Sequence, residues 1–302
     1  MNELVILGSG CGFATQDRFS TSIALLVDPN LYLFDCGEPC AALLFRHGID
    51  AAATKALFIS HMHHDHVSGL AAVLSSISVA RRSTKVKFRP WSIDRDAPWY
   101  RSAISFPRLT AAAPTLEERR SPIQLVIPAE ATEALQVYLP AVCLDPSNLP
   151  FELNFSPVRE GVTFSDERVR VTAVSSSHLS ANPAHAQLKS QPLHLALQSY
   201  SYAVAVDKTK VVFSGDLMTL DELNPLLQDA ELLIVEVAHY DPQEIGPFVR
   251  DLPLRRIVLT HIHPGLEERL PDLVRAWRDP RIQIAYDGKR IPLDQDYGGE
   301  SG

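Results

Sequence analysis

The most informative residues of the chain are four histidines and one aspartate within six positions, His61 to His66. Imidazole and carboxylate ligands suit Zn, Mn and Fe. The segment contains no cysteine, which argues against a closed structural zinc site with thiolate ligands. The segment follows an apolar stretch and precedes one with helical spacing, so we expect it on a turn at a sheet edge. There His61 and His63 can converge from alternate positions, while Asp65 and His66 reach a neighbouring point. The spacing predicts a metal site, and a chance cluster of solvated histidines is the disfavoured alternative.

Three further apolar stretches run out into residues that bind metals. One ends in Gly215-Asp216, where Asp216 alone would be read as a turn residue but, beside the histidine segment, is a candidate to bridge two metals. Another ends in Thr260-His261-Ile262-His263; either histidine could be a ligand, and His261 is nearer the strand end. The third precedes His178, which by itself would be read as a surface residue.

The composition limits the class of protein. The chain has 302 residues, 11 His, 4 Cys and a net charge of -8. This negative balance argues against holding nucleic acid by bulk charge, which requires Lys and Arg. The cysteines form no CxxC pair, no apolar run approaches the length of a membrane span, and the start does not resemble a signal peptide. We therefore expect a globular, cytoplasmic protein with no membrane partner.

The elements that must position these residues follow from apolar patterning. Helices are expected over 41–47, 67–76 and 130–139. Strands are expected over 4–7, 23–27, 31–34, 55–60, 123–127, 169–174, 201–206, 210–214, 232–237, 256–260 and, as the last, 282–285. This order is typical of an α/β layered fold.

A basic, aromatic and proline-punctuated stretch interrupts this order at about 80–122. It is predicted to be an insertion in a single domain that spans residues 1–302. One interpretation is a plain surface insertion, and the other is a lid or arm that recruits substrate, since loops on a rigid scaffold often carry specificity.

Several of these segments resemble the metallo-β-lactamase superfamily and, within it, the ribonuclease Z-like branch. The resemblance lies in Leu7–Gly10, in Phe34–Glu38 and above all in Phe58–Leu70, which contains the HxHxDH motif. It covers residues 4–75 and, more loosely, 123–288. It implies a four-layer αβ/βα sandwich, with two mixed sheets face to face and helices outside. Homodimers are common in that branch.

The resemblance also implies a dinuclear site that holds two divalent ions, Zn foremost, with Mn and Fe as alternatives. A water between the ions would become a metal-bound hydroxide and act as the nucleophile. Asp65 could also orient this hydroxide. The implied ligands are His61, His63 and His178 for the first metal, Asp65, His66 and His261 for the second, and Asp216 as the bridge.

The segment from Glu236 to His239 resembles a family strand end that supplies an acidic residue close to the metals. His239 is the candidate proton donor, because a histidine pKa is easily matched to the working pH, and a purely structural Glu236 is the alternative. Two features depart from ribonuclease Z. Tyr286 stands where a late metal-ligand histidine is usual, and no tRNA-gripping arm is evident between His178 and Tyr202. Both disfavour tRNA as the substrate.

The leading hypothesis is thus a metal-dependent phosphodiesterase acting on a small-molecule or nucleotide-like phosphodiester. The first alternative is a lactone, thioester or β-lactam hydrolase. Such enzymes share the fold and the metal ligands with phosphodiesterases, and the substrate pocket determines which bond is hydrolysed. The second is a metal-stabilised binding protein without catalysis. Five histidines are expected to be ordinary residues: His47, His64, His185, His194 and His263.

Overall fold

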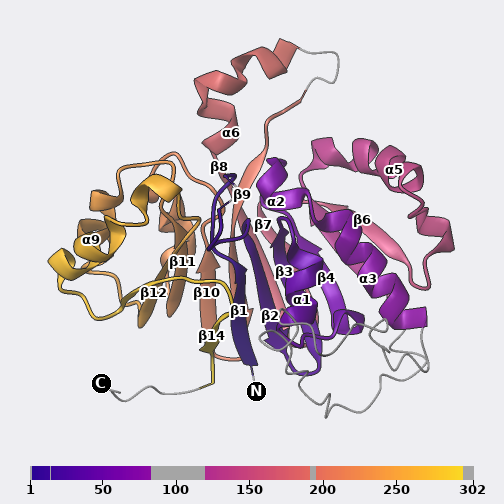
Figure 1. Cartoon of the computed structure of the whole chain (residues 1–302), viewed down its shortest axis with the longest axis horizontal. Helices are drawn as coiled ribbons and strands as arrows, with labels where there is room; N and C mark the ends of the chain where they lie inside the picture. Colours follow the sequence, from indigo (N-terminus) through magenta and orange to yellow (C-terminus); the bar gives the residue numbers. More distant parts are fainter. Residues whose placement is uncertain (1, 14, 83–119, 191–194, 295–302) are drawn as a thin grey trace, which may run out of the picture.

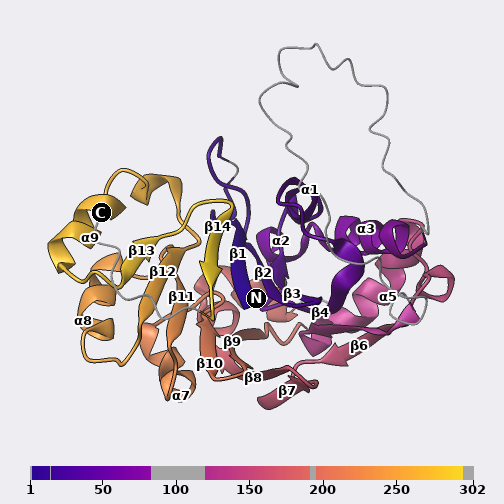
Figure 2. The same cartoon turned by 90° about the horizontal axis from the view of Figure 1, so that it is seen from below.

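The architecture is a four-layer sandwich, as the sequence predicted. The computed structural model describes residues 2–13, 15–82, 120–190 and 195–294. Two seven-stranded sheets pack face to face, and helices cover their outer faces (Figures 1 and 2). In none of the described ranges does a helix have the length and apolar character needed to cross a membrane.

The first sheet is antiparallel on one side and parallel on the other. Its order is β14 (Lys289–Pro292), β1 (Asn2–Gly8), β2 (Ser22–Val27), β3 (Asn30–Cys36), β4 (Thr54–Phe58), β5 (Ile123–Ile127) and β6 (Leu153–Pro157). Strands β14 to β3 pair antiparallel, and β3 to β6 pair parallel. Parallel strands end at the same edge of a sheet, so β3 and β4 deliver Asp35 and the histidine segment to one place.

The second sheet repeats this mixed arrangement. Its order is β13 (Ile282–Ile284), β12 (Arg256–Thr260), β11 (Leu232–Glu236), β10 (Thr209–Phe213), β9 (Ser199–Val206), β8 (Val169–Ser176) and β7 (Gly161–Ser165). Strands β10 to β13 are parallel, whereas β7 to β10 alternate in direction. Consequently β8, β10, β11 and β12 all end at one edge, next to His178, Asp216, Glu236 and His261.

An aromatic stack joins the two sheets below that edge. The ring centroid of Phe34 lies 4.8 Å from that of Phe58 and 4.3 Å from that of Phe213, and all three rings are buried. The buried ring of Tyr202 packs against the first two, and its hydroxyl donates to the carbonyl of Ile59. These contacts fix the two sheets relative to each other close to the candidate site.

Helices cover the outer faces of both sheets and reach the edge where the strands end. Helices α1 (Cys40–Arg46), α3 (Leu70–Arg82) and α5 (Thr132–Ala141) pack on the first sheet. Helices α7 (Asn224–Leu227), α8 (Ile245–Val249) and α9 (Leu270–Trp277) pack on the second (Figure 2). The short α2 (His64–Val67) and α6 (His178–Ala181) begin at the edge itself, so both carry candidate ligands.

Strands β6, β7 and β14 were not predicted. Residues 282–284 do form a strand, β13, but β14 follows it, so β13 is not the last strand. Strands β6 and β7 are only partly buried and lack a long apolar run, while β14 is a short edge strand with a proline, which suits an edge but weakens a sequence signal. Strand β14 still pairs with β1 because Leu4 and Ile291 pack in the same core.

The start of the predicted insertion is in fact core helix. Helix α3 extends to Arg82, and the buried guanidinium of Arg81 donates to the backbone carbonyls of Ala52, Thr54 and Ser121. A buried arginine satisfied by three carbonyls anchors the helix end rather than contacting a substrate. The rest of the insertion, 83–119, lies outside the described residues.

A segment between β8 and β9 stands out from the body of the sandwich (Figure 1). This projecting segment comprises residues 178–190 and 195–198, with α6 and the 3₁₀ helix η4 (Pro183–Ser190). A projecting segment thus follows His178, although the sequence did not make it evident; the expectation that no tRNA-gripping arm lies between His178 and Tyr202 stays a prediction. Between residues 178 and 198 the sequence contains one lysine and no arginine.

Candidate metal centre

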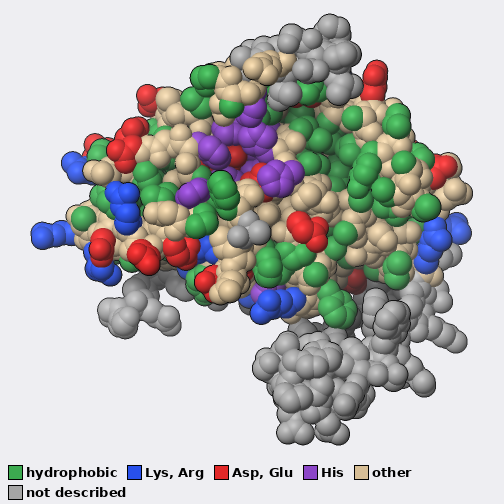
Figure 3. All heavy atoms as spheres, turned by 45° about the horizontal axis from the view of Figure 1, so that its top comes forward, with side chains coloured by type: hydrophobic (Ala, Val, Ile, Leu, Met, Phe, Trp, Pro, Cys, Tyr) green, Lys and Arg blue, Asp and Glu red, His purple; other side chains and the backbone are tan. Residues whose placement is uncertain are grey.

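Histidine side chains gather on one face of the molecule, at the edge where the strands of both sheets end. Figure 3 shows them grouped around carboxylates on the face that lies at the top of Figure 1. The ligand candidates come from the ends of β4, β8, β10 and β12. The convergence of parallel strand ends thus brings together residues separated by up to 200 positions in the chain.

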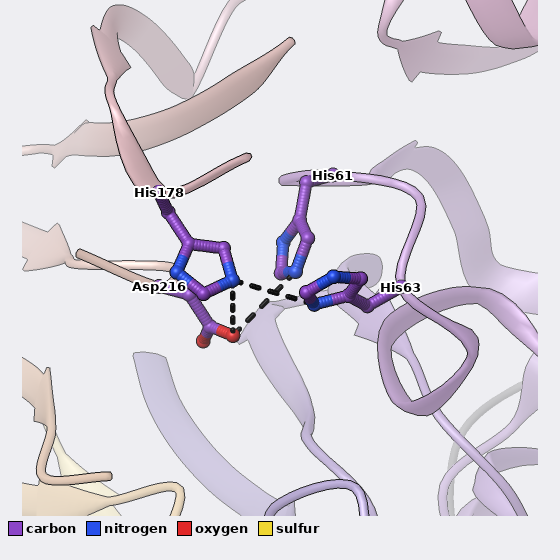
Figure 4. A group of neighbouring side chains, drawn as sticks. All are labelled: His61, His63, His178 and Asp216. Carbon is purple, nitrogen blue, oxygen red and sulfur yellow. Dashed lines mark hydrogen bonds and ion pairs between the residues drawn. The ribbon is translucent and has the colours of Figure 1, made fainter. Parts of the chain in front are cut away.

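The first group consists of His61, His63, His178 and Asp216, whose ligand atoms all lie within 4.8 Å of one another (Figure 4). Asp216 Oδ2 lies 3.5 Å from His61 Nε2 and 3.6 Å from His178 Nε2. His178 Nε2 is 3.3 Å from His63 Nδ1. Ligand atoms at 2.0–2.1 Å from a tetrahedral zinc ion are about 3.3 Å apart, so these spacings suit one ion.

The second group consists of Asp65, His66 and His261. Asp65 Oδ2 lies 3.6 Å from His66 Nε2 and 3.8 Å from His261 Nε2. These two nitrogens also lie 3.3 Å and 3.5 Å from Asp216 Oδ2. The same carboxylate oxygen therefore borders both groups, which is the placement a bridging ligand requires.

Several polar atoms at this point are buried without a hydrogen-bond partner. Within the described residues they include His61 Nε2, His66 Nε2 and both carboxylate oxygens of Asp216. A buried carboxylate without donors is costly unless a cation compensates it. These four atoms belong to proposed ligands, so the donor set fits metal ions, while Thr260 Oγ1 beside the site is also unpaired.

Asp35, at the end of β3, holds His66 and the turn that carries His61. Its carboxylate lies 2.7 Å from His66 Nδ1 and accepts from the backbone N–H and the hydroxyl of Ser60. Because the Ser60 hydroxyl donates to Asp35, its lone pairs face His61 Nδ1 at 3.0 Å. Both rings therefore carry their proton on Nδ1 and direct an unprotonated Nε2 to the ligand groups.

His261 is oriented in the same way from the other sheet. Its Nδ1 lies 2.6 Å from the hydroxyl of Thr21, which donates to the carbonyl of Gly10 and so accepts from the ring. The backbone of His261 has φ 55°, a left-handed conformation that is unusual for a side chain of this size. This backbone conformation directs the ring toward Asp216 directly after β12.

A glycine is required before the carboxylate of Asp216. Gly215 has φ +55°, and a Cβ atom there would lie 2.6 Å from the carbonyl oxygen of Tyr200. A larger residue would move this turn and with it Asp216. The Gly-Asp pair that was weak as a sequence signal therefore has a steric reason.

The electrostatics favour neutral His63 and His178 and a positive charge between the carboxylates. Burial lowers the pKa of His63 to about 4 and that of His178 to about 3, so both rings are in the ligand form at neutral pH. Burial also lowers the pKa of His66, but the charges of Asp216 and Asp35 outweigh this and hold it well above its ordinary value. The space between these carboxylates therefore favours positive charge.

Glu236 and His239 lie beside the carboxylate of Asp216. The buried carboxylate of Glu236 accepts from the backbone N–H groups of Leu217, Ala238 and His239. His239 Nδ1 is 3.3 Å from Glu236 Oε1 and 3.7 Å from Asp216 Oδ2, and the side chain of His239 is 29% exposed. Glu236 is thus fixed by the backbone and orients a histidine that reaches both the metal groups and solvent.

Most of the histidines expected to be ordinary lie away from the ligand groups. His47 packs near Gly288, and His263 packs edge to face against Phe13 with ring centroids 4.9 Å apart. His64 is exposed and turned to solvent, although its Nδ1 lies 3.9 Å from Asp65 Oδ1. Tyr286, which stands where ribonuclease Z usually has a ligand, is exposed. His194 is outside the described residues.

Three contributors were missed by sequence reasoning. Asp35 contacts the proposed ligand His66, and Thr21 contacts the proposed ligand His261. The local sequence shows only that Asp35 follows one apolar strand and that Thr21 shortly precedes another. His185 was expected to be ordinary, yet its Nε2 lies 3.3 Å from Nε2 of His63. It belongs to the projecting segment, and nothing in its local sequence marks it.

Comparison with known families defines the class. Residues 110–282 match the family described as beta-lactamase superfamily domain, and residues 2–89 match the family of the anti-Pycsar protein Apyc1. The first match covers more than half of the chain, which therefore belongs to the beta-lactamase superfamily.

Among curated proteins, the chain is 22% identical over 306 residues to ribonuclease Z of Methanothermobacter thermautotrophicus, with 87% of each chain covered. It is 30% identical over 179 residues to ribonuclease Z of Listeria innocua; this match covers 58% of the chain and 45% of that protein. The crystal structure of the short form of human tRNase Z superposes on this chain with a TM-score of 0.64 and covers 96% of this chain and 99% of that one. Because the two sequences are only 19% identical, this similarity supports the fold alone. Within this superfamily, the curated proteins described above to which the chain is similar are ribonucleases Z.

Proposed function

We propose that this protein is a metal-dependent hydrolase of phosphodiester bonds with a dinuclear centre. The observation that carries the proposal is the position of Asp216 Oδ2, which lies 3.3–3.6 Å from ligand nitrogens of both metal groups. Two adjacent cations suit an in-line displacement at phosphorus, because both the attacking and the leaving oxygen need stabilisation. The similarity to ribonuclease Z supports this class of bond.

The proposed ligands are nitrogen and oxygen donors without thiolate. This set suits zinc, with manganese and iron as the alternatives. Bound divalent ions would polarise the phosphoryl oxygens and lower the pKa of the attacking water. The proposed ligands are His61, His63 and His178 for one ion, Asp65, His66 and His261 for the other, and Asp216 for both.

The chain itself would orient the water and move the proton. The carboxylate of Asp65 borders the second group and could accept a hydrogen bond from the attacking water. His239 would donate a proton from Nε2 to the leaving oxygen, while Glu236 accepts from its Nδ1–H. Burial lowers the pKa of His239, but the hydrogen bond to Glu236 and the charge of Asp216 raise it above its ordinary value, which favours the protonated form that can donate.

We propose a small-molecule or nucleotide-like phosphodiester as the substrate rather than tRNA. The net charge is -8, and the projecting segment beside the site carries one lysine. A polyanion would find few phosphate contacts on such a surface. We also propose a cytoplasmic location, because all four cysteines are free, as in a reducing compartment, and homodimerisation by analogy with the branch.

A substrate panel combined with metal analysis tests the proposal. The purified protein should contain two divalent ions and hydrolyse bis-p-nitrophenyl phosphate, and Asp216→Asn should lose both properties. His64→Ala is the matched control, since His64 belongs to the same motif but is exposed. Turnover of lactones, thioesters or β-lactams without phosphodiesters would favour the first alternative. Tight metal binding with no turnover of any substrate would favour a binding protein.

A further inference from the structure

The ligand His63 differs from the other ligand histidines in what holds its outer nitrogen. The outer nitrogens of His61, His66 and His261 face Ser60, Asp35 and Thr21, which all belong to the sandwich. The outer nitrogen of His178 is buried without a hydrogen-bond partner among the described residues. His63 instead directs Nε2 at Nε2 of His185, 3.3 Å away, on the projecting segment. The two ring centroids are 5.0 Å apart with the planes inclined by 65°, so the contact is through the nitrogen edges rather than by stacking.

The neighbouring backbone determines the direction of this hydrogen bond. His185 Nδ1 lies 3.3 Å from the carbonyl oxygen of Leu179, which can only accept, so Nδ1 carries the proton. In the neutral imidazole of His185, Nε2 is then an acceptor. His63 must donate from Nε2, which leaves its Nδ1 unprotonated.

That unprotonated atom is the one that faces the first ligand group. His63 Nδ1 lies 3.3 Å from His178 Nε2, at the start of the projecting segment, whereas its Nε2 points away to His185 in η4. A histidine ligand must present a lone pair to the metal, and the hydrogen bond made by its other nitrogen selects the tautomer. The chain from Leu179 through His185 to His63 therefore selects the tautomer that can bind metal.

We propose that His185 is a positioning residue for the first metal and that, through it, metal binding and docking of the projecting segment stabilise each other. The coupling is reciprocal, because one contact contributes to both equilibria. The proposal rests on the metal centre of the proposed function, but it does not depend on which bond the protein hydrolyses.

Zinc affinity of three variants tests the role. His185→Phe keeps a ring and removes both nitrogens, whereas His185→Gln retains an oxygen that can accept from His63. His64→Phe, at an exposed position of the motif, is the control. Competition with a chromophoric chelator should show one zinc ion bound roughly 10–100-fold more weakly in His185→Phe. The other ion should keep its affinity, and His185→Gln should recover most of the loss.

Two readouts test the coupling without using activity. Nitrogen-15 spectra of the histidine rings in the zinc-loaded wild type should show His63 protonated at Nε2, a result that does not depend on the folding of any variant. Zinc should also slow trypsin cleavage after Lys189 in the wild type but not in His185→Phe.

The inference is overturned if His63 carries its proton on Nδ1, if His185→Phe binds zinc as tightly as the wild type, or if His185→Gln loses as much affinity as His185→Phe. A wild-type protein that shows the zinc behaviour but hydrolyses no phosphodiester would refute the proposed function and leave this inference standing.

Discussion

Replacing Asp35 by asparagine should weaken the binding of one metal ion, although Asp35 is not itself a proposed ligand. The carboxylate of Asp35 is 2.7 Å from His66 Nδ1 and also accepts from the N–H and hydroxyl of Ser60. In Asp35→Asn the amide oxygen can still accept from the Ser60 backbone, which leaves the NH₂ group facing His66. Two donors would then oppose each other, and the ring is driven to the tautomer with its proton on Nε2, where the metal should bind.

The size of the effect follows from the bond that is lost. A hydrogen bond to a charged group contributes about 1.5–3 kcal/mol, and His66 and Asp35 are both buried, so solvent does not replace it. Converted at about 1.4 kcal/mol per factor of ten, this is a loss of roughly 10- to 150-fold in affinity for one ion.

Chelator competition on Asp35→Asn measures this loss directly, and thermal unfolding in chelator checks that the variant is folded. Asp145→Asn is the matched control, because the Asp145 carboxylate also accepts backbone and hydroxyl hydrogen bonds but lies on an exposed turn. If folded Asp35→Asn binds two zinc ions within about threefold of the wild-type affinities, the assignment of Asp35 as the support of His66 is wrong.

Three further predictions concern the turn, the pH dependence and the acid. Gly215→Ala should lower the stability by at least about 1–2 kcal/mol, because its Cβ would meet a carbonyl oxygen 2.6 Å away in a left-handed turn; an unchanged melting temperature would contradict this. Zinc affinity should rise with pH above the ordinary histidine pKa of about 6.5, by up to about tenfold per pH unit, because His66, with its raised pKa, must lose a proton to bind, whereas His63 and His178 are already neutral. A flat profile from competition titrations would refute that reasoning. His239→Gln should lower kcat by about 10²–10⁴ for alkyl phosphodiesters and much less for bis-p-nitrophenyl phosphate, whose leaving group needs no proton. Equal losses with unchanged zinc content would exclude His239 as the acid.

The predictable part of the fold consists of elements with strong local signals. The stretch 256–260 became β12 and 123–127 became β5 with the same bounds, because both are buried apolar runs. Strand β14 was missed because its stability comes from pairing with β1 at the other end of the chain, and β7 was missed because it is largely exposed and lacks a buried apolar run, although it pairs with the neighbouring β8. Arg81 is a further case. Its charge predicts a surface position, but three backbone carbonyls accept hydrogen bonds from its guanidinium and hold it in the core.

The types of the candidate ligands were evident from the sequence, because the chemistry that suits a metal is a property of single side chains and the motif His61–His66 is local. Which nitrogen of each ring faces the metals was decided only by tertiary structure. Thr21 and His261 are 240 positions apart, and His63 and His185 are 122 apart. A tautomer depends on the partner of the opposite nitrogen, and folding alone brings that partner into place.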